Sequence, residues 1–251
     1  MRRILALLLA VSAFPVHAEM IKAKPAALIE PSLRLTEHQG RRPRVALTLD
    51  ACSGKVDHRI LDFLAQEKIP ATLFVTARWL KRNDAAIAVL KAHPDLFEIE
   101  DHGREHLAVV DRPMAIYGVK SVGSPEGVAI EVGGGAEAIV AAGFAQPKWF
   151  RGATAKYSTS AVTLVEGMGY RIAGYSLNGD GGSLLGAKEA ARRIARARDG
   201  DVIIAHINQP EYAAGSGVVE GVQALRVRGF DFVRLEDAAE GDGAFKASAL
   251  E

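Results

Sequence analysis

Cysteine is almost absent from this chain of 251 residues, because Cys52 is its single thiol. One cysteine cannot form an internal disulfide, so the fold must be held by an apolar core rather than by cross-links. A chain of this length with 49% hydrophobic residues can bury such a core in one or two domains.

An excess of charge of one sign is also lacking, since 31 basic residues face 30 acidic ones and leave a formal net charge of +1. This balance gives no argument for a nucleic-acid-binding surface, so we expect no nucleic-acid partner. Aromatic residues make up only 6% of the chain, and no run of rings marks a long glycan-binding groove. Nothing in the sequence indicates an oligomeric state.

After the first segment, no apolar stretch has the length of a membrane span, so we expect no membrane-spanning helix. Arg2 and Arg3 form a basic start, an apolar segment follows, and residues 16–18 form a small-x-small site. This pattern predicts a signal peptide over residues 1–18 and a periplasmic or secreted mature protein. Cleavage would remove both arginines and leave a net charge of −1.

The remaining chain divides into three parts by composition. Residues 19–40 are polar and contain proline, and we expect an N-terminal arm there. Residues 41–240 form the predicted catalytic domain, and residues 241–251 form a C-terminal tail.

Short apolar runs alternate with helical segments through the predicted domain. Three times in the second half, a helix ends in glycine and an aromatic residue, and a strand follows. The predicted strands cover residues 44–47, 71–76, 96–100, 147–151, 171–176, 201–205 and 231–235. Seven strands that alternate with helices predict an α/β fold with a parallel sheet, either a closed barrel or an open sheet. The glycine-rich residues 111–135 lack a clear period, and we expect a rim loop there that leads into a helix.

Polar side chains follow the predicted strands at the points where the strands end. They are Asp50, His102, Arg151, Asn178 and His206. A barrel would bring residues so distant in sequence to one rim, where enzymes on this fold place their chemistry. This clustering favours the barrel over the open sheet.

His102 and His106 are four residues apart directly after a predicted strand. A helical or turn-like backbone would place both imidazoles on one side. Two such nitrogens and an oxygen donor suit Zn²⁺ or a similar ion and leave a position open. The alternative is two surface histidines on a loop.

Four short motifs in this order resemble the polysaccharide deacetylases of carbohydrate esterase family 4, the NodB-homology domain. Thr48-Leu49-Asp50-Ala51-Cys52 matches the family's Thr-Phe-Asp-Asp-Gly, and His102-Gly103-Arg104-Glu105-His106 matches its His-Ser/Thr-x-x-His. Phe150-Arg151 matches the start of its arginine motif, and Ile204-Ala205-His206 matches its Leu-Leu-His. The resemblance covers residues 44–237 and implies a single deformed (β/α)7 barrel.

The resemblance also implies a function. It is the metal-dependent hydrolysis of N- or O-acetyl groups on a cell-envelope or extracellular polysaccharide or oligosaccharide, with Zn, Co or Ni as the divalent metal. Asp50 takes the place of the general base, Arg151 of the residue that orients this base, and His206 of the general acid. His102 and His106 take the places of metal ligands.

The departures from the family pattern leave ligands and roles open. Ala51 stands where the family has a metal-binding aspartate, so Asp50 is a further candidate ligand. Cys52 is either a thiolate ligand or a small buried residue. Asn208 either binds substrate or caps a loop, and Asp180 is either a turn former or a functional group.

Two other functions remain open because of the missing carboxylate. The first is an amide hydrolase on the same barrel that works without metal through Asp50 and His206. The second is a family member that binds a glycan without hydrolysing it.

Overall fold

The computed structural model describes residues 27–36, 42–239 and 245–249. The elements are β1 (Pro31–Leu35), β2 (Arg44–Ala51), α1 (His58–Gln66), β3 (Ala71–Val75), α2 (Ala77–Leu80), α3 (Asp84–Ala92), β4 (Phe97–Asp101), β5 (Ala115–Ile116), β6 (Val119–Lys120), α4 (Pro125–Ala141), β7 (Trp149–Phe150), α5 (Thr159–Gly167), β8 (Arg171–Ile172), β9 (Leu177–Asn178), α6 (Ala187–Ile194), β10 (Val202–His206), α7 (Ala214–Val227), β11 (Asp231–Val233), α8 (Leu235–Ala239) and β12 (Phe245–Ala249).

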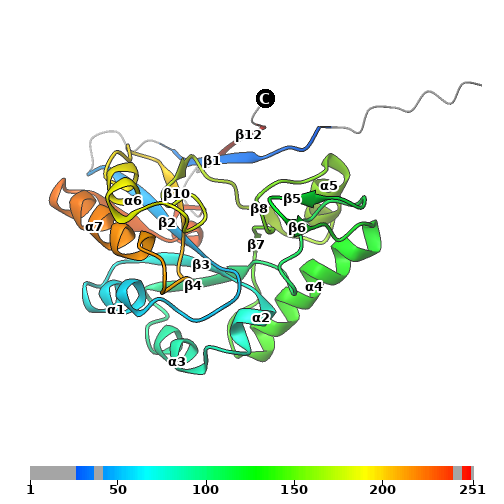
Figure 1. Ribbon diagram of the computed structural model, residues 1–251, viewed down its shortest axis with the longest axis horizontal. Helices are drawn as coiled ribbons and strands as arrows, with labels where there is room; N and C mark the ends of the chain where they lie inside the picture. Colours follow the sequence, from blue (N-terminus) through cyan, green and yellow to red (C-terminus); the bar gives the residue numbers. More distant parts are fainter. Residues whose placement is uncertain (1–26, 37–41, 240–244, 250–251) are drawn as a thin grey trace, which may run out of the picture.

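A curled parallel sheet forms the centre of the molecule, and helices surround its outer face (Figure 1). The strands follow the order β8-β7-β4-β3-β2-β10-β9, and β11 pairs with the first half of β2. Each strand in this sheet is parallel to its neighbours. The prediction of a deformed (β/α)7 barrel is therefore confirmed. No helix in the described part of the chain is long and apolar enough to cross a membrane.

Successive side chains along the strands face opposite sides of the sheet, which separates the apolar core from the polar residues of the interior. On β2, Leu47, Leu49 and Ala51 are fully buried in the cluster that lies between the sheet and helices such as α1 and α7. Thr48 and Asp50 point to the opposite, interior side, because successive side chains of a strand face opposite ways. The apolar outer face thus fixes the sheet against the helices and leaves the interior free for polar groups.

The predicted arm contributes a strand to the body of the protein. β1 lies against the segment between β8 and β9 and the turn before β10, because Leu33 and Leu35 donate their backbone N–H groups to the carbonyls of Tyr175 and Gly200. Both leucines are buried beside Phe74 and Trp149. β12, which lies in the predicted tail, pairs antiparallel with β1. The predicted signal peptide lies outside the described residues.

The glycine-rich stretch is a loop that leads into a helix, as expected, but the helix already covers its second half. α4 begins at Pro125 with Ser124 as its cap and includes Gly133, Gly134 and Gly135. A Cβ atom on Gly135 would lie 2.0 Å from a carboxylate oxygen of Asp101. The glycines let α4 pack directly on the segment after β4, a long-range contact that local sequence patterns do not reveal.

Two glutamates share the interior of the barrel near its base. Glu98 and Glu100 are 5% and 3% exposed and lie on the same face of β4. Glu98 accepts from the Thr72 hydroxyl at 2.6 Å, and Glu100 accepts from the backbone N–H groups of Lys148 and Trp149. Burial and the neighbouring Glu98 raise the pKa of Glu100 to about 9. The Glu98–Glu100 pair therefore retains a proton at neutral pH in the folded chain.

This pair predicts a loss of stability at alkaline pH. Above the ordinary glutamate pKa of 4.5, the unfolded chain releases the proton that folded Glu100 keeps until about pH 9. Unfolding then releases a proton, so the free energy of unfolding falls as pH rises through this window. Glu100→Gln should flatten the fall of Tm between pH 5 and 9, measured by calorimetry. The exposed Glu220→Gln is the matched control, and equal slopes for the two variants would contradict the assignment.

Candidate active site

A carboxylate–guanidinium pair lies in the interior of the barrel. Asp50, near the end of β2, is 4% exposed and accepts from Nη1 of Arg151 at 2.9 Å. Nη1 also donates to Thr48 Oγ1 at 2.8 Å, and Nε and Nη2 each donate at 3.1 Å to the carbonyls of Ala173 and Gly174. The guanidinium lies 4.3 Å from the ring centre of Phe74. Arg151 is thus fully engaged and cannot turn away from Asp50.

The electrostatic surroundings keep Asp50 ionised. Burial alone raises the pKa of this carboxyl group, but the charge of Arg151 opposes burial, and His102 and His206 add to it. The net result is a pKa below the ordinary value. A buried, ionised carboxylate held by a guanidinium is suited to accept a proton.

A second charged pair stands on the neighbouring strand. His206 ends β10 in direct register with Asp50 of β2. Its Nδ1 lies 3.0 Å from a carboxylate oxygen of Asp180, which is fully buried and also accepts from the His206 backbone N–H at 2.7 Å. Burial lowers the pKa of His206, but Asp180 outweighs burial and raises it well above the ordinary value. The structure thereby places Asp180 as the orienting partner of His206, a role that the sequence left open.

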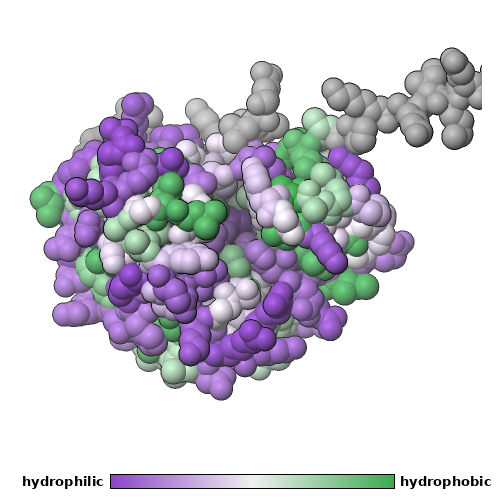
Figure 2. Space-filling view, in the orientation of Figure 1, coloured by the Kyte–Doolittle hydropathy of each residue, from purple (hydrophilic) through white to green (hydrophobic). Residues whose placement is uncertain are grey.

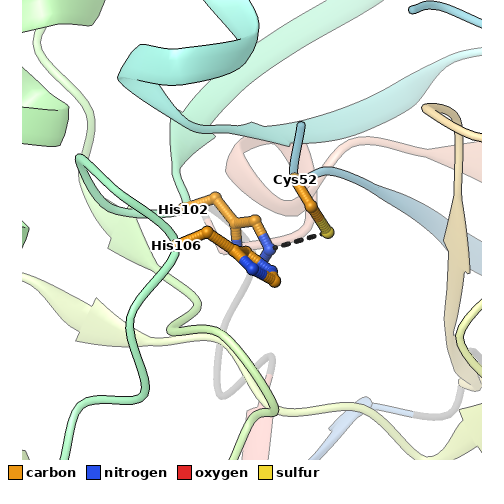
Figure 3. Close-up of side chains that lie close together, drawn as sticks. All are labelled: Cys52, His102 and His106. Atoms are coloured by element: carbon orange, nitrogen blue, oxygen red, sulfur yellow. Dashed lines mark hydrogen bonds between the residues drawn. The ribbon is translucent and has the colours of Figure 1, made fainter. Parts of the chain in front are cut away.

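The two predicted metal-binding histidines face each other across 5.1 Å between ring centres (Figure 3). The backbone between them is a loop rather than a helix. Gly103 and His106 both have positive φ angles, +89° and +61°, which a regular helix does not allow. His102 is 1% exposed, and its Nδ1 contacts the carbonyl oxygen of Arg151. A carbonyl only accepts, so Nδ1 carries a proton, and Nε2 is the ring nitrogen that faces the interior.

Glu131 of α4 holds this loop in place. Its carboxylate accepts from the backbone N–H groups of Glu105 and Leu107 at 3.0 Å, and its carbonyl accepts from Arg104. A Cβ atom on Gly103 would lie 2.5 Å from the same carboxylate, so only glycine fits beneath it. Sequence reasoning missed Glu131, because nothing local distinguishes it from a surface glutamate.

Three donor atoms converge at this point. The ligand atoms of Cys52, His102 and His106 all lie within 4.8 Å of one another, and Figure 3 shows the Cys52 side chain pointing toward the two imidazoles. Burial raises the pKa of the Cys52 thiol, but the two histidines lower it well below its ordinary value. Burial lowers the pKa of His102, but Asp50 and Cys52 raise it to about 9. One sulfur and two imidazole nitrogens are a donor set that suits zinc.

Asp50 does not belong to this convergent group. Its Oδ2 lies 3.8 Å from Nε2 of His102, and its Oδ1 is held by Arg151. Its predicted role as a metal ligand stays a prediction.

Asn208 lies beside the site rather than in its centre. Its amide donates to the Ser53 carbonyl at 2.5 Å, and its side chain is 1% exposed. This contact ties the segment after Cys52 to the segment after His206. Substrate binding by Asn208 also stays a prediction.

The parallel barrel with acidic, basic and histidine groups gathered where its strands end is the arrangement of (β/α)-barrel enzymes. The chain belongs to the polysaccharide deacetylase family, because the family model matches residues 37–173. No sequence among the curated proteins matches this chain.

Solved structures with the same fold include a deacetylase, an esterase and a pseudoenzyme. The peptidoglycan deacetylase PdaC from Bacillus subtilis has a TM-score of 0.62 at 18% identity, over 80% of this chain and 91% of its own. A family 4 carbohydrate esterase from Streptomyces lividans in complex with acetate has a TM-score of 0.60 at 17% identity, over 76% and 91%. A family 4 pseudoenzyme from Bacillus anthracis has a TM-score of 0.62 at 17% identity, over 81% and 67%.

We predict that Glu131→Ala loosens the histidine loop. The change leaves two backbone N–H groups without their acceptor, which costs about 1–3 kcal/mol. For a domain of this size the loss corresponds to a fall in Tm of roughly 3–10 °C. Hydrogen exchange of residues 103–107 should accelerate, whereas Glu131→Gln, which keeps one acceptor oxygen, should retain most of the protection. Unchanged exchange in the alanine variant would contradict this role.

Proposed function

We propose that this protein is a metal-dependent hydrolase that removes acetyl groups from a cell-envelope or extracellular polysaccharide or oligosaccharide. One observation carries the proposal. Asp50 and His206 stand in register on adjacent strands, next to the paired histidines, and each is held by a partner of opposite charge, Arg151 for Asp50 and Asp180 for His206. A base, an acid and two metal donors on one rim are what acyl-group hydrolysis requires.

Asp50 acts as the general base in this proposal. Its carboxylate is ionised and cannot rotate freely, because one oxygen is held by Arg151. The other oxygen faces His102 and is available to take a proton from the attacking water. Arg151 acts through Asp50 as a positioning residue.

His206 acts as the general acid. An amide nitrogen is a poor leaving group, so it needs a proton as the C–N bond breaks. Asp180 holds the imidazole through Nδ1, which leaves Nε2 as the atom that delivers the proton. The raised pKa of His206 keeps the ring charged at neutral pH.

His102 and His106 would hold the metal, with zinc favoured and cobalt or nickel as alternatives. The chemistry that a dication held there would supply is polarisation of the acetyl carbonyl and stabilisation of the charge that develops on its oxygen. The residues fit this group, since Nε2 of His102 is directed inward by the carbonyl of Arg151.

We further propose that the protein works in the periplasm or outside the cell, which is where the predicted signal peptide would deliver it. An acetylated envelope or extracellular glycan is accessible there.

The direct test is acetate release by protein loaded with Zn²⁺. Chito-oligosaccharides carry N-acetyl groups, and acetylated xylan carries O-acetyl groups. We expect acetate from at least one of them and none after chelation. Release that persists without metal would instead indicate the metal-independent amide hydrolase. Glycan binding without release would indicate a non-catalytic family member.

A second prediction concerns the acid role of His206. His206→Ala should slow hydrolysis of an acetamide by about 10²–10⁴, the usual worth of a general acid. The loss should be smaller on an aryl acetate, whose leaving group needs no proton. His58→Ala is the matched control, because His58 is exposed on α1. Equal losses on both substrates would show that His206 is not the acid.

A further inference from the structure

The histidine pair needs a third protein ligand, and the residue at the family's position cannot supply it. Ala51 is fully buried in the apolar cluster between the sheet and the helices. It also pairs in register with Val75 of β3, so the end of the strand is fixed. In this structure the side chain of Ala51 therefore points away from His102 and His106.

Cys52 lies on the side of the chain that faces the site. It follows Asp50 by two residues, the spacing that returns a side chain to the same face of a strand. The Thr76 hydroxyl donates to the Cys52 carbonyl, and the Thr76 N–H donates to the Ala51 carbonyl at 3.3 Å. These bonds fix the backbone that carries the thiol.

The distances suit coordination. Sγ of Cys52 lies 3.4 Å from Nε2 of His102. With zinc–sulfur and zinc–nitrogen bonds of about 2.3 and 2.0–2.1 Å, two ligands of a tetrahedral site lie about 3.5 Å apart. His106 completes the group within 4.8 Å.

The charges also fit. Imidazoles bind a metal in their neutral form and so provide no negative charge for a dication, and the carboxylate of Asp50 is already paired with Arg151. A cysteine thiolate supplies one negative charge, the same as the aspartate that the family pattern has at position 51. We propose that Cys52, as a thiolate, is the third metal ligand and that Asp50 remains free to act as the base. This inference rests on the metal-dependent function proposed above.

The set of one sulfur and two nitrogens leaves a fourth position open, as catalytic zinc sites require. It also predicts a preference for softer metals: affinity for Zn²⁺ and Co²⁺ should far exceed that for Mg²⁺ or Mn²⁺.

The test is titration of metal-free protein with Co²⁺ and Zn²⁺, followed by absorption spectroscopy and competition with a chelator. Wild type should bind one Co²⁺ per chain and show a near-ultraviolet thiolate-to-cobalt charge-transfer band. Cys52→Ser should lose this band and bind Zn²⁺ at least about 100-fold more weakly. Even the loss of a residue that only hydrogen-bonds to a ligand typically weakens metal binding 10–100-fold. Cys52→Asp should lose the band but bind Zn²⁺ more tightly than Cys52→Ser, because it restores an anionic donor.

Ala51→Asp is the matched control, because it adds the same carboxylate one residue earlier. We expect the wild-type band and unchanged Zn²⁺ affinity, with a lowered Tm because the carboxylate enters the apolar core. Tighter Zn²⁺ binding in Ala51→Asp would contradict the orientation argued for both residues.

The outcomes separate this inference from the proposed function. Cobalt binding without the band, or wild-type Zn²⁺ affinity in Cys52→Ser, would overturn the cysteine ligand and leave metal-dependent deacetylation standing. Failure of wild type to bind any of these metals would overturn both. An acetyl group trapped on Cys52 and detected by mass spectrometry would also overturn the inference, because an acylated sulfur cannot serve as the anionic ligand.

Discussion

The buried guanidinium of Arg151 is the group on which the rest of the site depends. It enters from the end of β7 and bonds to Thr48 and Asp50 on β2, so it spans the interior past β4 and β3. A buried charge without partners is strongly destabilising, and breaking such a pair typically costs 3–5 kcal/mol. Here the cost is offset by one carboxylate, one hydroxyl and two carbonyls. The backbone carbonyl of Arg151 also fixes the His102 ring. One residue therefore sets both the base and the orientation of a metal donor.

A second constraint is the close approach of α4 to the loop after β4. Gly134 and Gly135 leave no Cβ to collide with Arg104 and Asp101, so the helix lies against that loop. Glu131, one turn earlier on α4, can then reach the backbone N–H groups of Glu105 and Leu107. These two glycines thus help to position His106 through the packing of α4, although glycine usually weakens a helix.

The sequence was sufficient for features that depend on local pattern. Buried apolar runs identified β2, β3 and β10. Residues that directly follow apolar runs were placed near one another by the parallel topology alone, as His206 and Asp50 illustrate. Features that depend on contacts between distant elements were missed or left open. In the sequence Asp180 is typical of a turn, and its role depends on the pairing of β9 with β10, which brings it to His206. Glu131 is typical of an exposed helix position, and its role depends on the packing of α4 against the histidine loop.

Position 51 shows why an aligned motif can mislead at the end of a strand. A sequence alignment matches residues by their order in the chain, and it pairs Ala51 with the family's second aspartate. A strand alternates its faces, so the residue that shares a side with Asp50 is Cys52, not Ala51. Burial agrees, since Ala51 packs with the outer core while Sγ of Cys52 lies against His102. An anionic donor one residue later therefore preserves the charge of the ligand set, provided that the backbone places it on the interior face. The same reasoning applies to any barrel enzyme whose motif has lost a ligand: the replacement is to be sought by face and distance, and only then by position in the alignment.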